Sequence, residues 1–201
     1  DVADYTIVMA KKQTQGRGQM GTVWNSDDGK NLMFSVFKDL SIHDVEFPFY
    51  ISMAISLAVL KAFKTLNIPD LRIKWPNDIL SADKKICGIL IENVIKNKLN
   101  STIIGIGINV NQTEFVNLPK ASSLKKITGI HYDLDEILQS IIKHTKVYSE
   151  LLQQGDYDVV KNEYESQIIK KSSDAFWKEK MLELGGDYVI WSNAPENPSL
   201  N

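Results

Sequence analysis

Hydrophobic residues along this chain follow two patterns, one typical of buried strands and one typical of amphipathic helices. Short runs rich in β-branched and aromatic residues predict strands. These runs cover residues 5–10, 31–37, 71–75, 79–81, 86–94 and 101–110. Hydrophobic residues at helical spacing predict two long helices, over residues 47–66 and from Asp133 to Leu152, and a shorter helix through Val159, Val160 and Tyr164.

The predicted helices have recognisable ends. Pro69 lies just beyond the first helix, and Gly155 supplies a stop for the second. Residues 133–136 resemble a capping box with Asp in place of Ser or Thr, which places the start of the second helix at Asp133. Beyond Ser166 the pattern weakens into a polar tail with one further strand signal at residues 187–191.

The order of these elements predicts an α+β fold. Runs of strands with interspersed helices favour a mixed, mostly antiparallel sheet with helices packed on one side over a strict βαβ series. A chain of 201 residues can bury one substantial core. We therefore expect one main domain over residues 1–165 and a short C-terminal segment over residues 166–201.

Composition narrows the class of protein. A formal net charge of -2 provides no global basic field, which argues against a protein that wraps nucleic acid. The single cysteine, Cys87, cannot form an internal disulfide, and its hydrophobic run predicts a buried thiol in a reducing compartment. The chain has no hydrophobic run of about 18 residues and no basic, then hydrophobic leader, so we expect a cytoplasmic protein without a membrane partner.

A glycine-rich segment, GRGQMG at residues 16–21, is the first candidate for chemistry. Its spacing matches a dinucleotide fingerprint, but that fingerprint opens a helix, whereas residues 22–26 have the character of a strand or loop. The segment is better interpreted as a loop whose backbone amides and Arg17 close over an anion such as a phosphate. An ordinary surface loop is the alternative.

The second candidate is the KWPND segment at residues 74–78 together with Lys85. Pro76 fixes a turn, Trp75 can stack on a ligand or form a pocket wall, and a tight hairpin can bring the ammonium groups of Lys74 and Lys85 to one site. Charges at the inner ends of buried strands usually face a ligand. The alternative is a pair of edge lysines that discourage aggregation.

The third candidate is the glycine-containing strand at residues 105–109. Gly105 and Gly107 permit close approach of a flat ligand, and Asn109 could hold a phosphate or a metal-bound water. A tight crossing of two strands would explain the same glycines.

Taken in order, these segments resemble the catalytic core of biotin protein ligases. That family has a GRGxxGxxW loop, a KWPND segment, a strand that begins with lysine and ends with glutamate, and a GxGxN strand. Here these stand at residues 16–24, 74–78, 85–92 and 105–109, and the resemblance extends over residues 5–152. It implies the biotin/lipoate ligase fold, which is similar to class II synthetases.

The resemblance also implies a two-step reaction. The carboxylate of biotin attacks the α-phosphorus of ATP, pyrophosphate leaves, and a lysine of a biotin carboxyl carrier protein then attacks the enzyme-held biotinyl-5'-AMP. ATP and Mg²⁺ are the implied cofactors. Because Mg²⁺ bridges phosphate oxygens and keeps several waters, no residue is assigned as a direct metal ligand.

Site residues follow by matching the family's motifs to this sequence. The resemblance implies catalytic roles for Lys85, Asp78 and Arg17, with Lys85 between the biotin carboxylate and the α-phosphate, where an ammonium stabilises developing charge. Binding roles are implied for Gln13, Gly16, Arg17 and Gly18 around biotin and the adenylate, and for Lys74, Asn77, Asp78 and Asn109 around the triphosphate and its Mg²⁺. The same site is implied to include Trp24, Lys85, Gly88, Gly105 and Gly107 as binding residues.

The chain departs from the family pattern in three places. Gln19, Met20 and Thr22 stand where relatives often carry arginine, which predicts either looser retention of the adenylate or retention by other residues. The family's biotin-contacting Ser-Thr-Asn segment does not precede the glycine loop, so we expect the N-terminal part of the catalytic domain to be missing, with incomplete binding of biotin as the alternative. Residues 166–201 match the family's small C-terminal β domain poorly, as a partial or degenerate version.

The sequence also indicates which binding partners and which alternative functions to expect. No helix-turn-helix pattern precedes the core, so DNA binding is not expected, whereas a homodimer is possible through the sheet. A lipoate-protein ligase is the nearest alternative function, although that family's arginine-rich loop is not present. A non-enzymatic nucleotide- or biotin-binding module is the second alternative, favoured by the glycine spacing.

Overall fold

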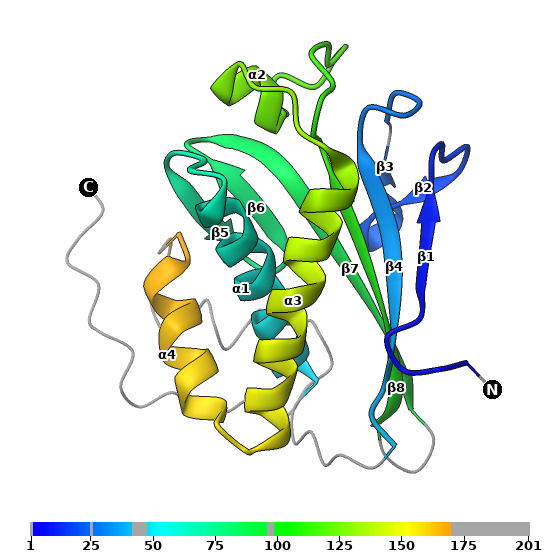
Figure 1. Cartoon of the computed structure of the whole chain (residues 1–201), viewed down its shortest axis with the longest axis vertical. Coiled ribbons are helices and arrows are strands. Elements are labelled where there is room, and N and C mark those ends of the chain that lie inside the picture. Colours follow the sequence, from blue (N-terminus) through cyan, green and yellow to red (C-terminus); the bar gives the residue numbers. More distant parts are fainter. Residues whose placement is uncertain (1, 25, 42–47, 96–98, 170–201) are drawn as a thin grey trace. The chain divides into compact units, whose positions relative to one another are not determined.

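The computed structural model describes residues 2–24, 26–41, 48–95 and 99–169. Within these residues the main feature is a six-stranded sheet with the order β1-β4-β8-β7-β6-β5 (Figure 1). Its strands are β1 (Ile7–Ala10), β4 (Leu32–Asp39), β5 (Leu71–Lys74), β6 (Asp78–Ser81), β7 (Lys84–Ile95) and β8 (Leu99–Ile108). All neighbouring strands pair antiparallel, so the predicted fold class is confirmed.

Two faces of the sheet differ because side chains alternate along each strand. Directly opposed pairs on β4 and β8 alternate between large buried residues and positions that include glycine. The buried pairs are Leu32/Ile108, Phe34/Ile106 and Val36/Ile104, and the pairs between them are Met33/Gly107 and Ser35/Gly105. The first set builds the hydrophobic core, and the second leaves space on the opposite face.

Three long helices cover the hydrophobic face (Figure 1). They are α1 (Phe49–Thr65), α3 (Leu134–Gln153) and α4 (Tyr157–Gln167). The predicted capping role of Asp133 is confirmed, because its side chain accepts hydrogen bonds from the Asp135 and Glu136 amides. The first helix was predicted from Phe47, which lies outside the described residues, and the structure begins it at Phe49.

A short helix, α2 (Leu124–Thr128), was not predicted. It begins at Ser123, whose hydroxyl accepts a hydrogen bond from the Lys126 amide, and it ends at Gly129 in the left-handed conformation with φ of 77°. Five residues are too few for helical periodicity to be visible in the sequence. The serine and glycine caps were the available signal.

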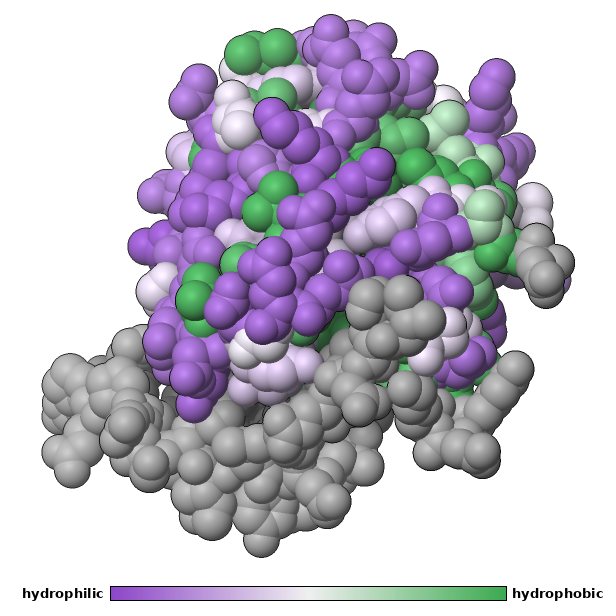
Figure 2. Space-filling model, turned by 60° about the horizontal axis from the view of Figure 1, so that its bottom comes forward, coloured by the Kyte–Doolittle hydropathy of each residue, from purple (hydrophilic) through white to green (hydrophobic). Residues whose placement is uncertain are grey.

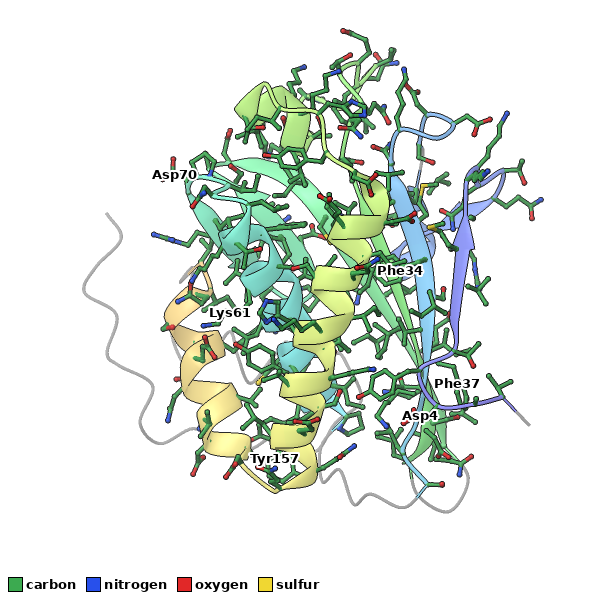
Figure 3. All side chains as sticks on the ribbon, in the orientation of Figure 1. Asp4, Phe34, Phe37, Lys61, Asp70 and Tyr157 are labelled. Atoms are coloured by element: carbon green, nitrogen blue, oxygen red, sulfur yellow. The ribbon has the colours of Figure 1, made fainter. Side chains whose placement is uncertain are left out.

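An ion-pair network joins the three long helices to one another. Glu163 of α4 accepts the Lys61 ammonium from α1 at 2.7 Å and the Tyr148 hydroxyl from α3 at 2.6 Å. Figure 3 labels Lys61 on the helical layer. Burial alone would raise the pKa of Glu163, but the hydrogen bonds from Lys61 and Tyr148 and the positive charges of Lys61 and Lys64 lower it. The carboxylate is therefore stabilised in its charged form.

The segment before β1 is fastened to β4 by a second ion pair. Lys38 is almost fully buried, and its ammonium binds the Asp4 carboxylate at 2.7 Å and the Asp39 carbonyl at 2.9 Å. Figure 3 shows Asp4 beside the end of β4, near Phe37. The Lys38 charge also lies 4.9 Å from the centre of the Tyr5 ring. The buried cation is thus partnered by this segment together with a carbonyl of β4.

The outer surface of the described residues is mostly hydrophilic over the helices, and hydrophobic residues gather toward one side (Figure 2). Exposed hydrophobic side chains include Ile7, Val8 and Met9 of the edge strand β1. None of the described helices combines the length and the hydrophobicity that crossing a bilayer requires.

Residues 1–168 form one compact unit. Its last helix, α4, runs to Gln167, a little beyond the predicted domain boundary at residue 165. Ile168 then makes a bridge to Ile73 of β5. The strand predicted at residues 187–191 lies outside the described residues.

Candidate active site

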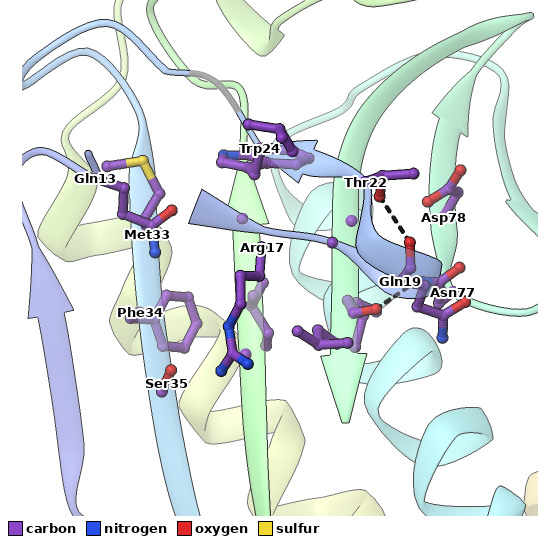
Figure 4. A pocket seen from close by; sticks show the side chains of 18 of the residues that line it. Gln13, Arg17, Gln19, Thr22, Trp24, Met33, Phe34, Ser35, Asn77 and Asp78 are labelled. Atoms are coloured by element: carbon purple, nitrogen blue, oxygen red, sulfur yellow. Dashed lines mark hydrogen bonds between the residues drawn. The ribbon is translucent and has the colours of Figure 1, made fainter. Parts of the chain in front are cut away.

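A cavity of about 440 Å³ lies on the face of the sheet opposite the helices. It is covered by residues 16–24, which we call the glycine arm (Figure 4). The arm consists of β2 (Gly16–Arg17), a 3-10 turn (Gln19–Gly21) and β3 (Val23–Trp24), and β2 pairs antiparallel with β3. The glycine-rich segment is therefore a small hairpin rather than the start of an α-helix, as its sequence predicted.

Many of the predicted site residues line this cavity. They are Gln13, Arg17, Gly18, Trp24, Asn77, Asp78, Lys85, Gly88, Gly105 and Gly107. The structure thus brings together segments that are more than 60 residues apart in the chain, because β4, β8, β7 and β6 are neighbours in one sheet.

The floor of the cavity is a pair of glycines. Gly88 of β7 and Gly107 of β8 lie directly opposite each other, and the Trp24 indole lies against both. A Cβ atom at Gly107 would stand 2.7 Å from Cε2 of Trp24, and one at Gly88 would stand 3.1 Å from Cζ3. Side chains at these positions would push the indole off the sheet. The glycines are therefore required by close packing, but the neighbour at Gly107 is the Trp24 ring, whereas the sequence predicted a flat ligand or a crossing strand there.

Lys85 points into the cavity because of a β-bulge. Leu80 of β6 lies opposite Lys85, but Ile79 lies opposite Cys87, so Ile86 is an extra residue on β7. Ile86 and Cys87 are consequently both buried, and strict alternation would have put Lys85 on the Cys87 side of the sheet. The bulge instead brings the Lys85 ammonium to within 3.3 Å of the position of a Cβ on Gly88.

Two ammonium groups converge on one carboxylate. The Lys85 nitrogen lies 2.6 Å from one oxygen of Asp78, and the Lys74 nitrogen lies 3.9 Å from the other. Lys85 also lies 5.6 Å from the centre of the Trp24 ring. Asp78 is the most sheltered of the three charges, with 15% of its side chain exposed. The cluster carries one excess positive charge beside the cavity, which suits an anionic ligand.

The KWPND turn is fastened to the sheet through Asn77. Its side-chain amide donates to the Ile89 carbonyl at 2.6 Å, and the Ile89 amide donates to the Asn77 carbonyl at 2.9 Å. The Trp75–Pro76 peptide is cis. Trp75 does not form the predicted pocket wall, since it is not among the described residues that line the cavity, and its ring instead lies 6.4 Å from that of Phe49 on α1.

Arg17 lies away from the Lys85 cluster. Its guanidinium pairs with Glu92 of β7 at 3.5 Å, and three quarters of its side chain is exposed. Figure 4 shows it pointing away from Asp78. Along one strand, Glu92 is four residues from Gly88, a distance of about 13 Å. The three residues with predicted catalytic roles are therefore divided between two ends of the cavity.

Three predicted site residues lie next to the cavity rather than in its lining. Gly16 pairs with Trp24 at the base of the glycine arm. Lys74 reaches the site through Asp78. Asn109 is buried just beyond β8. Its main-chain amide donates to the Ile86 carbonyl, and its main-chain carbonyl accepts from the Leu124 amide.

Sequence reasoning missed several lining residues, among them Met33, Ser35, Leu90 and Glu92. They share the face of Gly105 and Gly107. Met33 lies opposite Gly107, Ser35 and Leu90 lie opposite Gly105, and Glu92 follows Leu90 by two residues on β7. The available signal was the alternation within residues 32–37, which groups Met33 with Ser35.

Two further features concern reactivity and metals. The Cys87 thiol is fully buried, as predicted, and burial raises its pKa, so it stays protonated and unreactive.

Among the described residues, no three His, Cys, Asp or Glu side chains gather into a metal-binding cluster. The Asp78 carboxylate does suit Mg²⁺ bound to phosphates, which needs one or two carboxylates and keeps its waters.

The antiparallel sheet, the helices on one of its faces and the cavity under the glycine arm are the features expected of biotin and lipoate ligases, and the comparison of sequences gives the same class. The chain belongs to the biotin/lipoate A/B protein ligase family, which it matches over residues 1–109.

Within that family, the chain is similar to named biotin protein ligases. It is 37% identical over 142 residues to the bifunctional ligase/repressor BirA of Bacillus subtilis, which covers 68% of this chain and 43% of that protein. It is 29% identical over 143 residues to the biotin–[acetyl-CoA-carboxylase] ligase of Mycobacterium tuberculosis, covering 70% of this chain and 52% of that protein. The chain therefore spans about half the length of these relatives or less.

A solved structure supports the same assignment. The biotin protein ligase of Aquifex aeolicus in complex with biotin and ATP superposes with a TM-score of 0.75 and 29% identity, over 84% of this chain and 71% of that one. The predicted resemblance to biotin protein ligases is therefore confirmed at the level of family and fold.

Proposed function

We propose that this protein activates biotin with ATP to give biotinyl-5'-AMP and transfers the biotinyl group to a lysine of a biotin carboxyl carrier protein. The observation that carries the proposal is the bulge at Ile86, which turns Lys85 onto a glycine floor beside Asp78. Membership of the biotin/lipoate ligase family and the likeness to a ligase that binds biotin and ATP support it.

In the first step, a carboxylate oxygen of biotin attacks the α-phosphorus of ATP, and the bond to pyrophosphate breaks. Both reactants are anions, so a cation between them lowers their repulsion and stabilises the charge that develops on the phosphoryl oxygens. Lys85 can supply that cation, since its ammonium lies at the cavity floor, held by Asp78 and the Trp24 ring.

Lys74, Asn77 and Asp78 lie at the end of the cavity that suits the leaving pyrophosphate. Asp78 would hold Mg²⁺, which when bound neutralises phosphate charge. Lys74, with 60% of its side chain exposed, is free to leave Asp78 and contact an incoming phosphate.

In the second step, the amine of the carrier lysine attacks the carbonyl carbon of the adenylate, AMP leaves, and the amine nitrogen loses a proton. The adenylate is a mixed anhydride that water would hydrolyse, so the site must exclude water. The glycine arm and Trp24 already cover the cavity and are suited to that task.

The direct test is biotin-dependent exchange of labelled pyrophosphate into ATP by the full-length protein. We expect exchange with biotin and none with lipoate. Exchange with lipoate alone would identify a lipoate ligase, and absence of exchange with either acid would favour a binding module without ligase activity. The carrier protein, a homodimer and the cytoplasmic location stay predictions.

A further inference from the structure

Residues 27–31, which connect the exit of the glycine arm at Asp27 to β4, are joined to the segment after β8 by hydrogen bonds of amide groups. Asn31, which precedes β4, accepts a hydrogen bond from the Val110 amide at 3.0 Å and donates to the Gln112 side chain at 2.5 Å. The main-chain amide of Asn111 donates to the Lys30 carbonyl at 2.8 Å. Asn31 and Gln112 are almost fully buried, so these bonds form in a setting where an unmade bond would be costly.

Gln112 makes the connection that lies nearest to the arm. Its side-chain oxygen accepts from the Asp27 amide at 3.1 Å, three residues after Trp24, as well as from Asn31. Its side-chain nitrogen donates to the Glu114 carbonyl at 2.7 Å. Both the oxygen and the nitrogen of this side chain are therefore engaged, and the one oxygen fixes both the arm's exit and the start of β4.

The same segment also supports Lys85. The Gln112 carbonyl accepts from the Ser123 hydroxyl at 2.5 Å, which fixes the start of α2. The neighbouring Ser122 amide donates to the Lys85 carbonyl at 3.0 Å, and the Lys85 amide donates to the Lys120 carbonyl at 2.7 Å. Residues 112–123 thus contact the arm's exit at one end and the backbone of Lys85 at the other.

We propose that Gln112 is a positioning residue that holds Trp24 and the glycine arm in register with Lys85. This inference deepens the proposed function and rests on it. Among the described residues the Trp24 indole nitrogen finds no hydrogen-bond partner, so the place of the ring depends on its contacts with Gly88, Gly107 and Lys85 and on where the arm's exit is held. The Gln112 side chain bonds the arm's exit and the start of β4, whereas its main-chain carbonyl supports the segment that holds Lys85.

The experiment compares Gln112→Met with Asn111→Leu. Asn111 is equally buried and makes two bonds of the same kind, at 2.8 and 3.0 Å, but to the Tyr132 backbone and not to the arm. Both variants lose two or more buried hydrogen bonds, so both should melt at a lower temperature. Only Gln112→Met should speed hydrogen exchange at the Asp27 amide, by about tenfold, which corresponds to about 1.4 kcal/mol.

The kinetic readout uses the exchange of pyrophosphate into ATP. Gln112→Met should raise KM for biotin about tenfold and change kcat less than threefold, because the backbone support of Lys85 is retained. Asn111→Leu should change KM less than twofold. If Gln112→Met does not fold, Gln112→Asn withdraws the oxygen from Asp27 more mildly and should shift both readouts in the same direction.

Equal hydrogen exchange at Asp27 in the two variants would overturn the positioning role, as would an equal change in KM. A parent protein without biotin-dependent exchange would refute the proposed function, while the hydrogen exchange at Asp27 would still decide whether Gln112 holds the arm.

Discussion

Lys85, Asp78 and the paired glycines define the chemistry at the scale of single residues. The ammonium of Lys85 is held between a carboxylate at 2.6 Å and an indole ring, above a floor without side chains. A ligand that displaces Asp78 from Lys85 would gain the full ammonium charge. The site is therefore suited to an anion that binds beside the Trp24 ring, which itself lies against Gly88 and Gly107.

Replacing Lys85 tests the central charge. Lys85→Ala should lower the rate of biotin-dependent pyrophosphate exchange by about 10²–10³, the typical loss for one stabilising donor in a transition state. The matched control is Lys84→Ala, since Lys84 binds the Pro119 carbonyl outside the cavity lining. Lys84→Ala should change the rate less than threefold, and equal losses in the two variants would contradict the assignment of Lys85.

Replacing Gly107 tests the floor. Gly107→Ala should displace the Trp24 ring, lower the free energy of unfolding by about 1–3 kcal/mol, and weaken biotin binding measured by calorimetry. Gly105→Ala, on the same strand and face, is the control for displacement of the ring only, because its Cβ would meet the Leu90 carbonyl at 3.3 Å rather than Trp24 while Gly105 also lines the cavity. The proposal for the floor fails if Gly107→Ala binds biotin as the parent does.

The helices and strands supply the support on which those residues depend. Glu163 connects α4 to α1 and α3 through Lys61 and Tyr148, and these helices pack on the hydrophobic face of the sheet. Asp4 connects the segment before β1 to Lys38 of β4. Both connections are ion pairs whose residues do not line the cavity, so substitutions there should change the stability of the fold without changing the cavity lining.

The lowered pKa of Glu163 predicts a pH dependence of stability. A carboxyl whose pKa is lower in the folded state contributes stability above its ordinary pKa of about 4.5, and this contribution is lost as pH falls through the folded value. Urea unfolding at pH 7 and at about pH 3.5 should therefore show a smaller loss on acidification for Glu163→Gln than for the parent. Lys61→Met should reduce the loss in the same direction.

Removing the Asp4–Lys38 ion pair should lower the free energy of unfolding more than removing an exposed ion pair does. Asp4→Ala leaves the ammonium of Lys38 buried with one carbonyl partner and should lower the free energy of unfolding by about 1–3 kcal/mol. Asp27→Ala removes an exposed ion pair with Lys30 and should cost less than about 0.5 kcal/mol. Denaturant melts of the two variants check the difference.

Ligand binding is a property of the whole molecule, because the cavity is built from the sheet, the glycine arm and the KWPND turn together. A ligand that binds only the assembled cavity stabilises the folded state as a unit. The segment from Gln112 to Ser123 contacts both the exit of the glycine arm and the strand that carries Lys85, so its effect on binding also concerns the whole molecule.

Biotin should raise the melting temperature of the protein. At a ligand concentration of 100 Kd the stabilisation is about 2.7 kcal/mol, which corresponds to roughly 5–10 °C for a domain of this size. ATP with biotin should raise it further, whereas lipoate should leave it unchanged. A melting temperature that does not respond to biotin at saturating concentration would contradict biotin binding.

The sequence predicted most elements to within a few residues, because the spacing of hydrophobic residues directly reports which backbone positions are buried. It missed α2, which is too short to show a period. It also assigned Trp75 to a pocket wall, but the ring packs with Phe49 of α1, a contact that joins residues 26 positions apart in the chain and has no local signal.

By itself, the sequence determined the strands, the long helices, the glycines that allow close approach, and the motifs that identify the family, since these depend on local conformation and residue type. Only the tertiary structure decided where the charges point. Pairing of β6 with β7 inserts Ile86 as a bulge and turns Lys85 to the open face, while Glu92 draws Arg17 to the other end of the cavity. Register between strands is a long-range property, so a cluster seen in the sequence becomes a site only when the sheet forms.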